Sequence, residues 1–131
     1  MRFSHGSPLR DDEILTTATP DDVLADALAG VTESLVVGGH THRQFIRDLG
    51  SGLTYANAGS VGLPYEGRPG AFWMMVIDGV PELQETTYDV DAAARELQAS
   101  GLAFDDQLQR SLLQPVDPDQ VAAFLERAAG R

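Results

Sequence analysis

A short apolar run that ends in glycines and histidines constrains this chain more than any other feature. The run is Ser34-Leu35-Val36-Val37, and Gly38-Gly39 and then His40-Thr41-His42 follow it directly. A continuous apolar run of this length, stopped by glycine, is typical of a strand that is buried on both faces. The chain has only three histidines, and the third, His5, also lies in a glycine-flanked turn after an expected strand. The sequence therefore predicts a sheet with histidines at the ends of its strands.

The spacing of His40 and His42 suggests a common site for their side chains. In extended backbone, side chains two residues apart point to one side, and the preceding glycines allow a sharp turn. The chain contains no cysteine, so a metal ion would need nitrogen and oxygen ligands. Neutral imidazoles suit manganese, iron, nickel or zinc. A pair of exposed loop histidines without a ligand is the alternative interpretation of this spacing.

The remaining strand signals indicate a mixed α/β fold. Residues 1–6 resemble the tail of a strand that runs into a turn. Between residues 45 and 90 the expected strands read as an antiparallel meander, punctuated by glycine-rich turns. These strands cover residues 45–49, 53–56, 71–77 and 82–88.

Helices are expected before the buried strand and at the end of the chain. Thr19-Pro20-Asp21-Asp22 predicts a helix start with a hydroxyl N-cap, and that helix should end near Gly30. Asp91 is expected to cap a helix that runs to about residue 99, and a further helix is expected around residues 105–113. The last helix should begin at Asp117-Pro118-Asp119, with one face formed by Val121, Phe124 and Leu125.

Length and charge limit the classes of function. The 131 residues are enough for one ordinary domain. Twenty acidic residues against nine basic ones give a net charge of −11, which repels nucleic-acid backbones. No apolar run approaches the roughly 20 residues of a membrane span, and no secretory signal follows Met1, so the cytoplasm is the expected compartment. An acidic enzyme still acts on phosphate esters when divalent cations supply the positive charge.

Three motifs occur in an order that points to a known family. They are His5-Gly6, Gly39-His40-Thr41-His42 and Asn57-Ala58-Gly59-Ser60-Val61-Gly62, and Tyr88-Asp89 follows them. The sequence resembles the calcineurin-like metallophosphoesterases, most closely the small bacterial phosphodiesterases. In that family one strand ends in His-Gly, a second ends in Gly-His-Thr-His, and a hairpin carries Asn-Pro-Gly-Ser-Val. Ala58 replaces the usual proline, a change that removes a fixed backbone torsion but no ligand.

The resemblance implies a fold and a site. The chain would form the C-terminal half of an α/β/β/α sandwich, with residues 1–90 in the core and residues 91–131 as a helical appendage packed on it. By the same resemblance, His5 and His40 would bind the second of two divalent ions and His42 the first, with Mn²⁺ preferred. Arg43 and Asn57 would contact the substrate, a small phosphate ester. A surface ion pair is the alternative for Arg43, and ordinary turn chemistry is the alternative for Asn57.

The other half of the family pattern does not occur in these residues. Asp-x-His, Gly-Asp and Gly-Asn motifs, which supply the aspartates, the asparagine ligand and the general acid in the family, are absent from the sequence. We therefore expect the complete enzyme to hydrolyse phosphomonoesters or phosphodiesters and this chain alone to be inactive.

Several explanations for the missing motifs stay open. They are a late or frameshifted gene start, cleavage, or a genuine remnant that pairs with another polypeptide or with itself. In the last case the strands over residues 35–37 and 72–77 would have unpaired edges or uncovered faces. The rival function is a non-catalytic interaction or ligand-binding domain.

Overall fold

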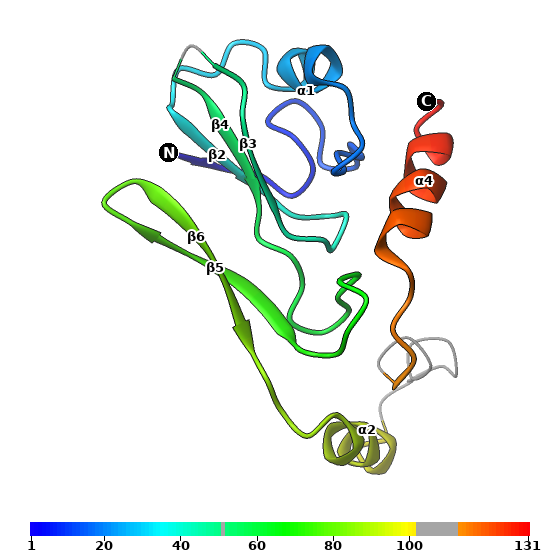
Figure 1. Cartoon of the computed structure of the whole chain (residues 1–131). Helices are drawn as coiled ribbons and strands as arrows, with labels where there is room; N and C mark the ends of the chain where they lie inside the picture. Colours follow the sequence, from blue (N-terminus) through cyan, green and yellow to red (C-terminus); the bar gives the residue numbers. More distant parts are fainter. Residues whose placement is uncertain (51, 102–112) are drawn as a thin grey trace.

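The protein was analysed as a computed structural model, which describes residues 1–50, 52–101 and 113–131. In this part of the chain the strands form two sheets, and Figure 1 shows how helices lie around them. The strands are β1 (Arg2–Phe3), β2 (Leu35–Gly38), β3 (Phe45–Asp48), β4 (Thr54–Asn57), β5 (Ala71–Ile77) and β6 (Val80–Thr86). The helices are α1 (Asp21–Ala27), α2 (Val90–Ala99) and α4 (Pro118–Ala128).

The first sheet is mixed and has the strand order β1-β2-β4-β3. Strands β1, β2 and β4 run parallel, and β3 is antiparallel to β4. Every residue of β2 is buried, which confirms the strand predicted from the apolar run. The expected unpaired edge at residues 35–37 is wrong, because Val37 lies opposite Phe3 on one side and Ala56 on the other.

Strands β5 and β6 form a separate antiparallel hairpin. The expected single meander is therefore two antiparallel pairs in two sheets. The reason is the long connection over residues 58–70, whose glycines and prolines separate β4 from β5 and carry the chain to a second layer.

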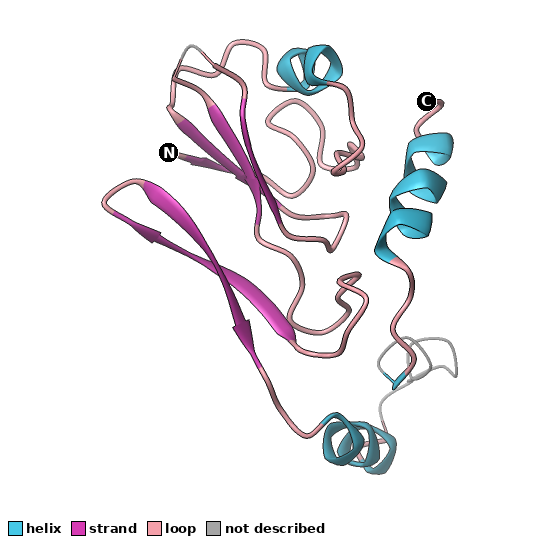
Figure 2. Cartoon of the chain, viewed as in Figure 1, coloured by secondary structure: helices cyan, strands magenta, loops and turns pink. Residues whose placement is uncertain are grey.

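The two faces of the first sheet bury different clusters. On one face, Leu24 of α1 and Leu28 at its C-cap pack with Val36 and Tyr55. On the other face, Met74 and Val76 of β5 pack against a cluster formed by Leu35, Val37 and Ala56. The layers are thus helix, mixed sheet and hairpin (Figure 2), the arrangement of part of an α/β/β/α sandwich.

The outer face of the hairpin is exposed. Trp73, Met75 and Ile77 are 36%, 39% and 45% exposed, and within the described ranges β6 is the only strand that pairs with β5. This is the uncovered face expected for residues 72–77. Association of the chain through it stays a prediction.

Two helix caps differ from the sequence-based expectation. The N-cap of α1 is Pro20, without a side-chain cap, because the Thr19 hydroxyl bonds to Glu126 instead. The N-cap of α2 is Asp89, whose carboxylate accepts from the Ala92 amide at 2.8 Å, and Asp91 lies in the first turn. At α1 the competing partner Glu126 has thus taken the hydroxyl that the sequence offered as a cap.

Helix α4 begins where the sequence predicted, but its buried face is different. Asp117 accepts bonds from the first turn of the helix, as an N-cap should. Phe124 is 61% exposed, whereas Ala122 and Glu126 are buried. The helix expected around residues 105–113 falls almost wholly outside the described residues. Among the helices that are described, none has the length and apolar character needed to cross a membrane.

Candidate functional site

The candidate site lies where β1 and β2 end, side by side in the sheet. His5 follows β1, and residues 38–44, here called the histidine loop, begin at the end of β2. Because the two strands are parallel neighbours, their carboxyl ends meet at one edge of the sheet. His5 Nε2 lies 3.1 Å from His40 Nδ1, and the two rings meet edge to face.

The separation of these two nitrogens is that of a hydrogen bond between the rings, and it also fits two ligands of one metal ion. Nitrogens that each lie about 2.1 Å from an ion are about 3.0 to 3.4 Å apart at right-angled or tetrahedral geometry. The observed 3.1 Å falls within this interval. Two neutral imidazoles are also a donor set that divalent transition metals accept.

The histidine loop is not extended, so the extended backbone expected above for His40 and His42 is wrong. His40 and His42 have φ values of 63° and 56°, in the left-handed region that residues other than glycine rarely adopt. Such backbone persists only where its surroundings impose it, and it is commonly found at functional sites. One of these surroundings is His5, whose carbonyl accepts from the Gly39 amide at 2.8 Å.

The buried side chain of Asn57 holds the histidine loop through hydrogen bonds. Its side chain is 0% exposed, and its Nδ2 donates to the Gly39 carbonyl at 2.6 Å and to Thr41 Oγ1 at 3.0 Å. Its Oδ1 accepts from the Gly59 amide at 2.9 Å. Thr41 in turn donates to the Leu15 carbonyl at 2.8 Å. Asn57 thus anchors the backbone of the histidine loop. Its contact with a substrate stays a prediction.

His42 is oriented by residues that follow β4. Its Nδ1 lies 2.9 Å from the Leu63 carbonyl, its ring stacks on Tyr65, and its own carbonyl accepts from the Tyr65 amide at 3.0 Å. A carbonyl only accepts, so Nδ1 must carry the hydrogen of the neutral ring. The lone pair is then on Nε2, the arrangement that a metal-binding histidine adopts.

We expect NMR to find His42 as the Nδ1–H tautomer, with a pKa below that of a free imidazole. Burial lowers its pKa, and positive charge on His40 or His5 lowers it further, while the bond to Leu63 partly offsets both. A lowered pKa in the folded state means that His42 stabilises the protein above about pH 6.5. That stability is lost as the pH falls through the folded pKa. An Nε2–H tautomer or a raised pKa in a ¹⁵N-edited titration would contradict this assignment.

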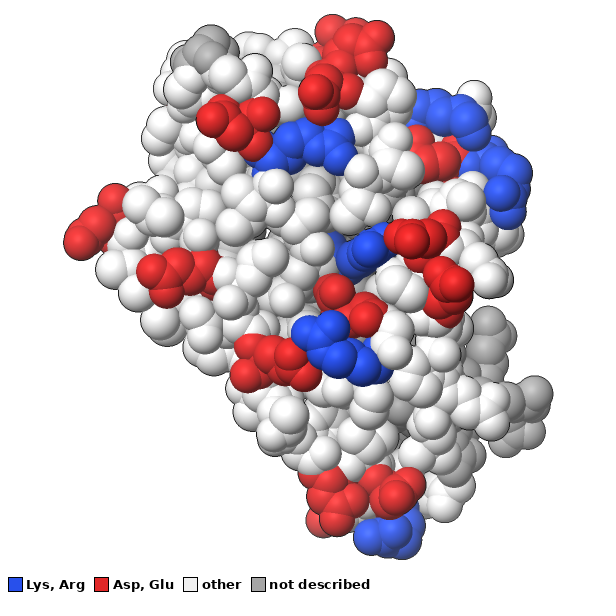
Figure 3. All heavy atoms as spheres, viewed as in Figure 1, with Lys and Arg blue, Asp and Glu red and all other residues white. Residues whose placement is uncertain are grey.

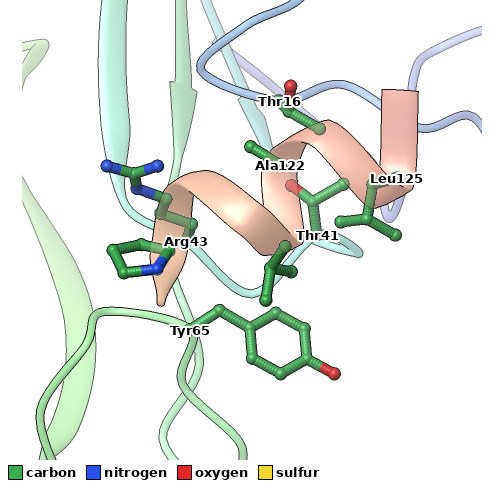
Figure 4. Close-up of a pocket in the computed structure, with 8 residues that line it drawn as sticks. Thr16, Thr41, Arg43, Tyr65, Ala122 and Leu125 are labelled. Carbon is green, nitrogen blue, oxygen red and sulfur yellow. The ribbon is translucent and has the colours of Figure 1, made fainter. Parts of the chain in front are cut away.

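Arg43 points from the histidine loop toward α4. Its Nη1 donates to Asp119 Oδ1 at 2.9 Å and to Thr17 Oγ1 at 3.2 Å. It also lines a narrow apolar seam, shown in Figure 4, where Thr41 and Tyr65 face Ala122 of α4. The structure therefore shows Arg43 in the ion pair that was the alternative to substrate contact.

Carboxylates are not gathered around the histidines. Within residues 1–50, 52–101 and 113–131, no group of three or more histidine and acidic side chains is placed to hold an ion. On the face shown in Figure 3, the arginines lie beside acidic groups, consistent with ion pairs such as Arg68–Glu85 and Arg47–Asp21. The site thus has imidazoles without the carboxylates that a complete two-metal centre needs.

Three residues of the site were missed from the sequence. Thr41 lies within the histidine motif, and its position between two histidines could have marked it as a loop anchor. Leu63 acts through its carbonyl, and Tyr65 through its ring and amide. Neither has a sequence signal, because a backbone carbonyl and a loop tyrosine occur in any chain.

Comparisons with known proteins find similarity in structure only. No protein-family profile and no curated protein sequence matches this chain. A metallophosphoesterase from Sphaerobacter thermophilus superposes with a TM-score of 0.66 at 20% identity, over 87% of this chain and 54% of the other. A hypothetical protein from Pyrococcus horikoshii OT3 superposes with a TM-score of 0.70 at 15% identity, over 84% of this chain and 44% of the other.

These likenesses establish the fold. The chain has a metallophosphoesterase-like fold and spans about half the length of the solved chains that it matches. The fold expected from the three motifs is therefore confirmed, including its partial extent.

Proposed function

Starting from this metallophosphoesterase-like fold, we propose that the chain supplies the histidine ligands of a two-metal phosphoesterase centre. The observation that supports it best is the 3.1 Å separation of His5 Nε2 and His40 Nδ1 at the end of parallel strands. His5 and His40 would share one divalent ion, and His42 would bind the other through Nε2. Manganese is the proposed metal, with iron, nickel or zinc as alternatives.

The proposed reaction is hydrolysis of a small phosphomonoester or phosphodiester. Divalent ions bound there would polarise the phosphoryl oxygens and lower the pKa of a bound water. The residues of the chain itself would orient the histidines. Asn57 and Thr41 fix the backbone of the histidine loop, and the Leu63 carbonyl leaves the His42 lone pair on Nε2.

Arg43 and Asn57 have different roles in this proposal. Arg43 would contact a phosphoryl oxygen by exchanging its bond to the Asp119 carboxylate, which is 87% exposed, for a bond to the substrate. Asn57 would act through the loop that it holds, since its Nδ2 is already bonded to that loop and its Oδ1 to the Gly59 amide.

Three imidazoles divided between two ions are too few ligands for a stable hydrolytic centre. We propose that the carboxylate ligands come from a polypeptide segment outside these 131 residues. The chain alone would then bind metal without turning over substrate.

A hydrolysis assay tests whether the metal centre is incomplete in this chain. The purified 131-residue chain is incubated with Mn²⁺ and an aryl phosphodiester or phosphomonoester, with His40→Ala in parallel. We expect no hydrolysis above the buffer rate from either protein. Hydrolysis that His40→Ala abolishes would contradict the proposal, because a working site would then assemble from these residues alone.

A second arm tests the phosphoesterase assignment itself. The DNA upstream of Met1 is examined for Asp-x-His, Gly-Asp and Gly-Asn motifs in any frame, and the polypeptide that includes them is assayed with Mn²⁺. We expect hydrolysis that depends on His40. An inactive polypeptide, or no such motifs, would favour the non-catalytic interaction domain.

A further inference from the structure

We propose that α4 positions the histidine loop and that Glu126 is the residue that fixes α4 in place. Glu126 lies on the inner face of α4 and is 7% exposed. Its Oε1 accepts from the hydroxyls of Thr16 and Thr19, both at 2.6 Å. Its Oε2 accepts from Arg131 Nε, also at 2.6 Å. A buried carboxylate with this many partners fixes the helix in one position.

The bonds to Glu126 favour its ionised form. Burial alone would raise the pKa of this carboxyl, but the bonds from Arg131, Thr16 and Thr19 outweigh burial and lower the pKa overall. Charge-assisted bonds of this kind are stronger than neutral ones, and losing them leaves buried hydroxyls without an acceptor. Glu126 therefore attaches α4 to Thr16 and Thr19 through charge-assisted hydrogen bonds.

Beyond this attachment the helix faces the histidine loop and the tyrosine that stacks on it. Ala122 and Leu125 face Thr41 and Tyr65 across the seam in Figure 4. Thr41 lies between the two histidines, and Tyr65 stacks on the ring of His42. The helix thus faces the loop at Thr41, and it also faces Tyr65, the residue that stacks on His42.

The first turn of α4 makes a second attachment beside the loop. Asp119 bonds to Arg43, the residue after His42. Pro118 packs closely on the turn at Gly67, where an added Cβ would lie 3.2 Å from its ring. The first turn of the helix therefore contacts the segments that carry His42 and Tyr65, while Glu126 near its other end bonds to Thr16 and Thr19.

This arrangement gives α4 a structural role, which is to support the histidine loop. The left-handed backbone at His40 and His42 is intrinsically unfavourable and needs external support. Asn57 supports the loop through Gly39 and Thr41, and α4 faces Thr41 and the neighbouring Tyr65. Releasing α4 should loosen the loop while the sheet stays intact.

The test compares Glu126→Ala with Arg127→Ala, a neighbouring exposed position on the same helix. Hydrogen exchange is followed at the amides of Thr41 and Tyr65, which donate to the carbonyls of Gly39 and His42. In Glu126→Ala we expect both amides to exchange at least about tenfold faster, with the β2 amides unchanged. Arg127→Ala should match the wild type.

A spectroscopic readout separates positioning from general destabilisation. The ring resonances of His42 should shift in Glu126→Ala at constant pH, because its stacking partner Tyr65 is released. Glu126→Gln keeps an oxygen for the threonine hydroxyls, so it should restore the His42 resonances at least in part. Unchanged Thr41 and Tyr65 amides in a protein whose α4 amides exchange faster would overturn the proposal, because the helix would then be a passive cover.

These readouts use the chain without metal. If the wild type failed to bind Mn²⁺, the proposed function would fall while the exchange result still decided the role of α4. If Mn²⁺ bound equally well to Glu126→Ala and the Thr41 amide stayed protected, α4 would have no positioning role.

Discussion

Replacing Gly38 by alanine is expected to lower the free energy of unfolding by about 3 kcal/mol, a large effect for one methyl group. The added Cβ would lie 2.1 Å from the hydroxyl oxygen of Tyr55 and 2.8 Å from its Cζ. Tyr55 is 0% exposed and packed in the main core, so its ring has no room to withdraw. Urea denaturation followed by circular dichroism measures the loss.

The adjacent glycine is the matched control. A Cβ at Gly39 would have the His5 carbonyl oxygen as its nearest neighbour, at an ordinary 3.7 Å, so Gly39→Ala should change stability by no more than about 0.5 kcal/mol. Adding Tyr55→Phe to Gly38→Ala removes the closest atom and should recover part of the loss. Equal stability of the two glycine variants would show that the end of β2 is not packed as described.

Replacing Asn57 by leucine is expected to cost about 2–4 kcal/mol. Leucine has a similar size, but it leaves the Gly39 carbonyl and the Gly59 amide without their partner and removes one bond to Thr41. Because these groups lie under the histidine loop, Mn²⁺ binding should weaken as well. Denaturation and a metal titration measure the two effects.

An exposed amide provides the control for this substitution. Gln98 lies on the solvent side of α2, so Gln98→Leu makes the same chemical change with an effect of about 0.5 kcal/mol or less. Asn57→Asp keeps the shape and the oxygen that accepts from Gly59, but it turns a second oxygen toward the Gly39 carbonyl. Asn57→Asp should therefore also lower the free energy of unfolding. An unchanged free energy of unfolding in Asn57→Asp would contradict the role given to Asn57.

The parts of the structure that local sequence determines were predictable. The apolar run before Gly38 is β2, and the acidic-proline start at Asp117 is the beginning of α4. The resemblance of three motifs anticipated the fold that the structural comparisons confirm. It also named His5 and His40 as ligands of one ion, and the structure places their nitrogens 3.1 Å apart.

The parts that depend on distant partners were not predictable. Thr19 looks like an N-cap, yet its hydroxyl bonds to a residue 107 positions away. Hydropathy placed Phe124 on the buried face of α4, whereas the structure buries Glu126, because its bonds to two threonines and an arginine compensate for burial. The left-handed backbone of the histidines likewise arises from tertiary contacts and not from their own conformational preferences.

Anomalous diffraction from crystals soaked in Mn²⁺ would test the metal-binding claim most directly. The proposal predicts a peak about 2.1 Å from a nitrogen of His5 and a nitrogen of His40, and its loss in His40→Ala. Crystals with manganese bound elsewhere and no peak at these histidines would contradict the account.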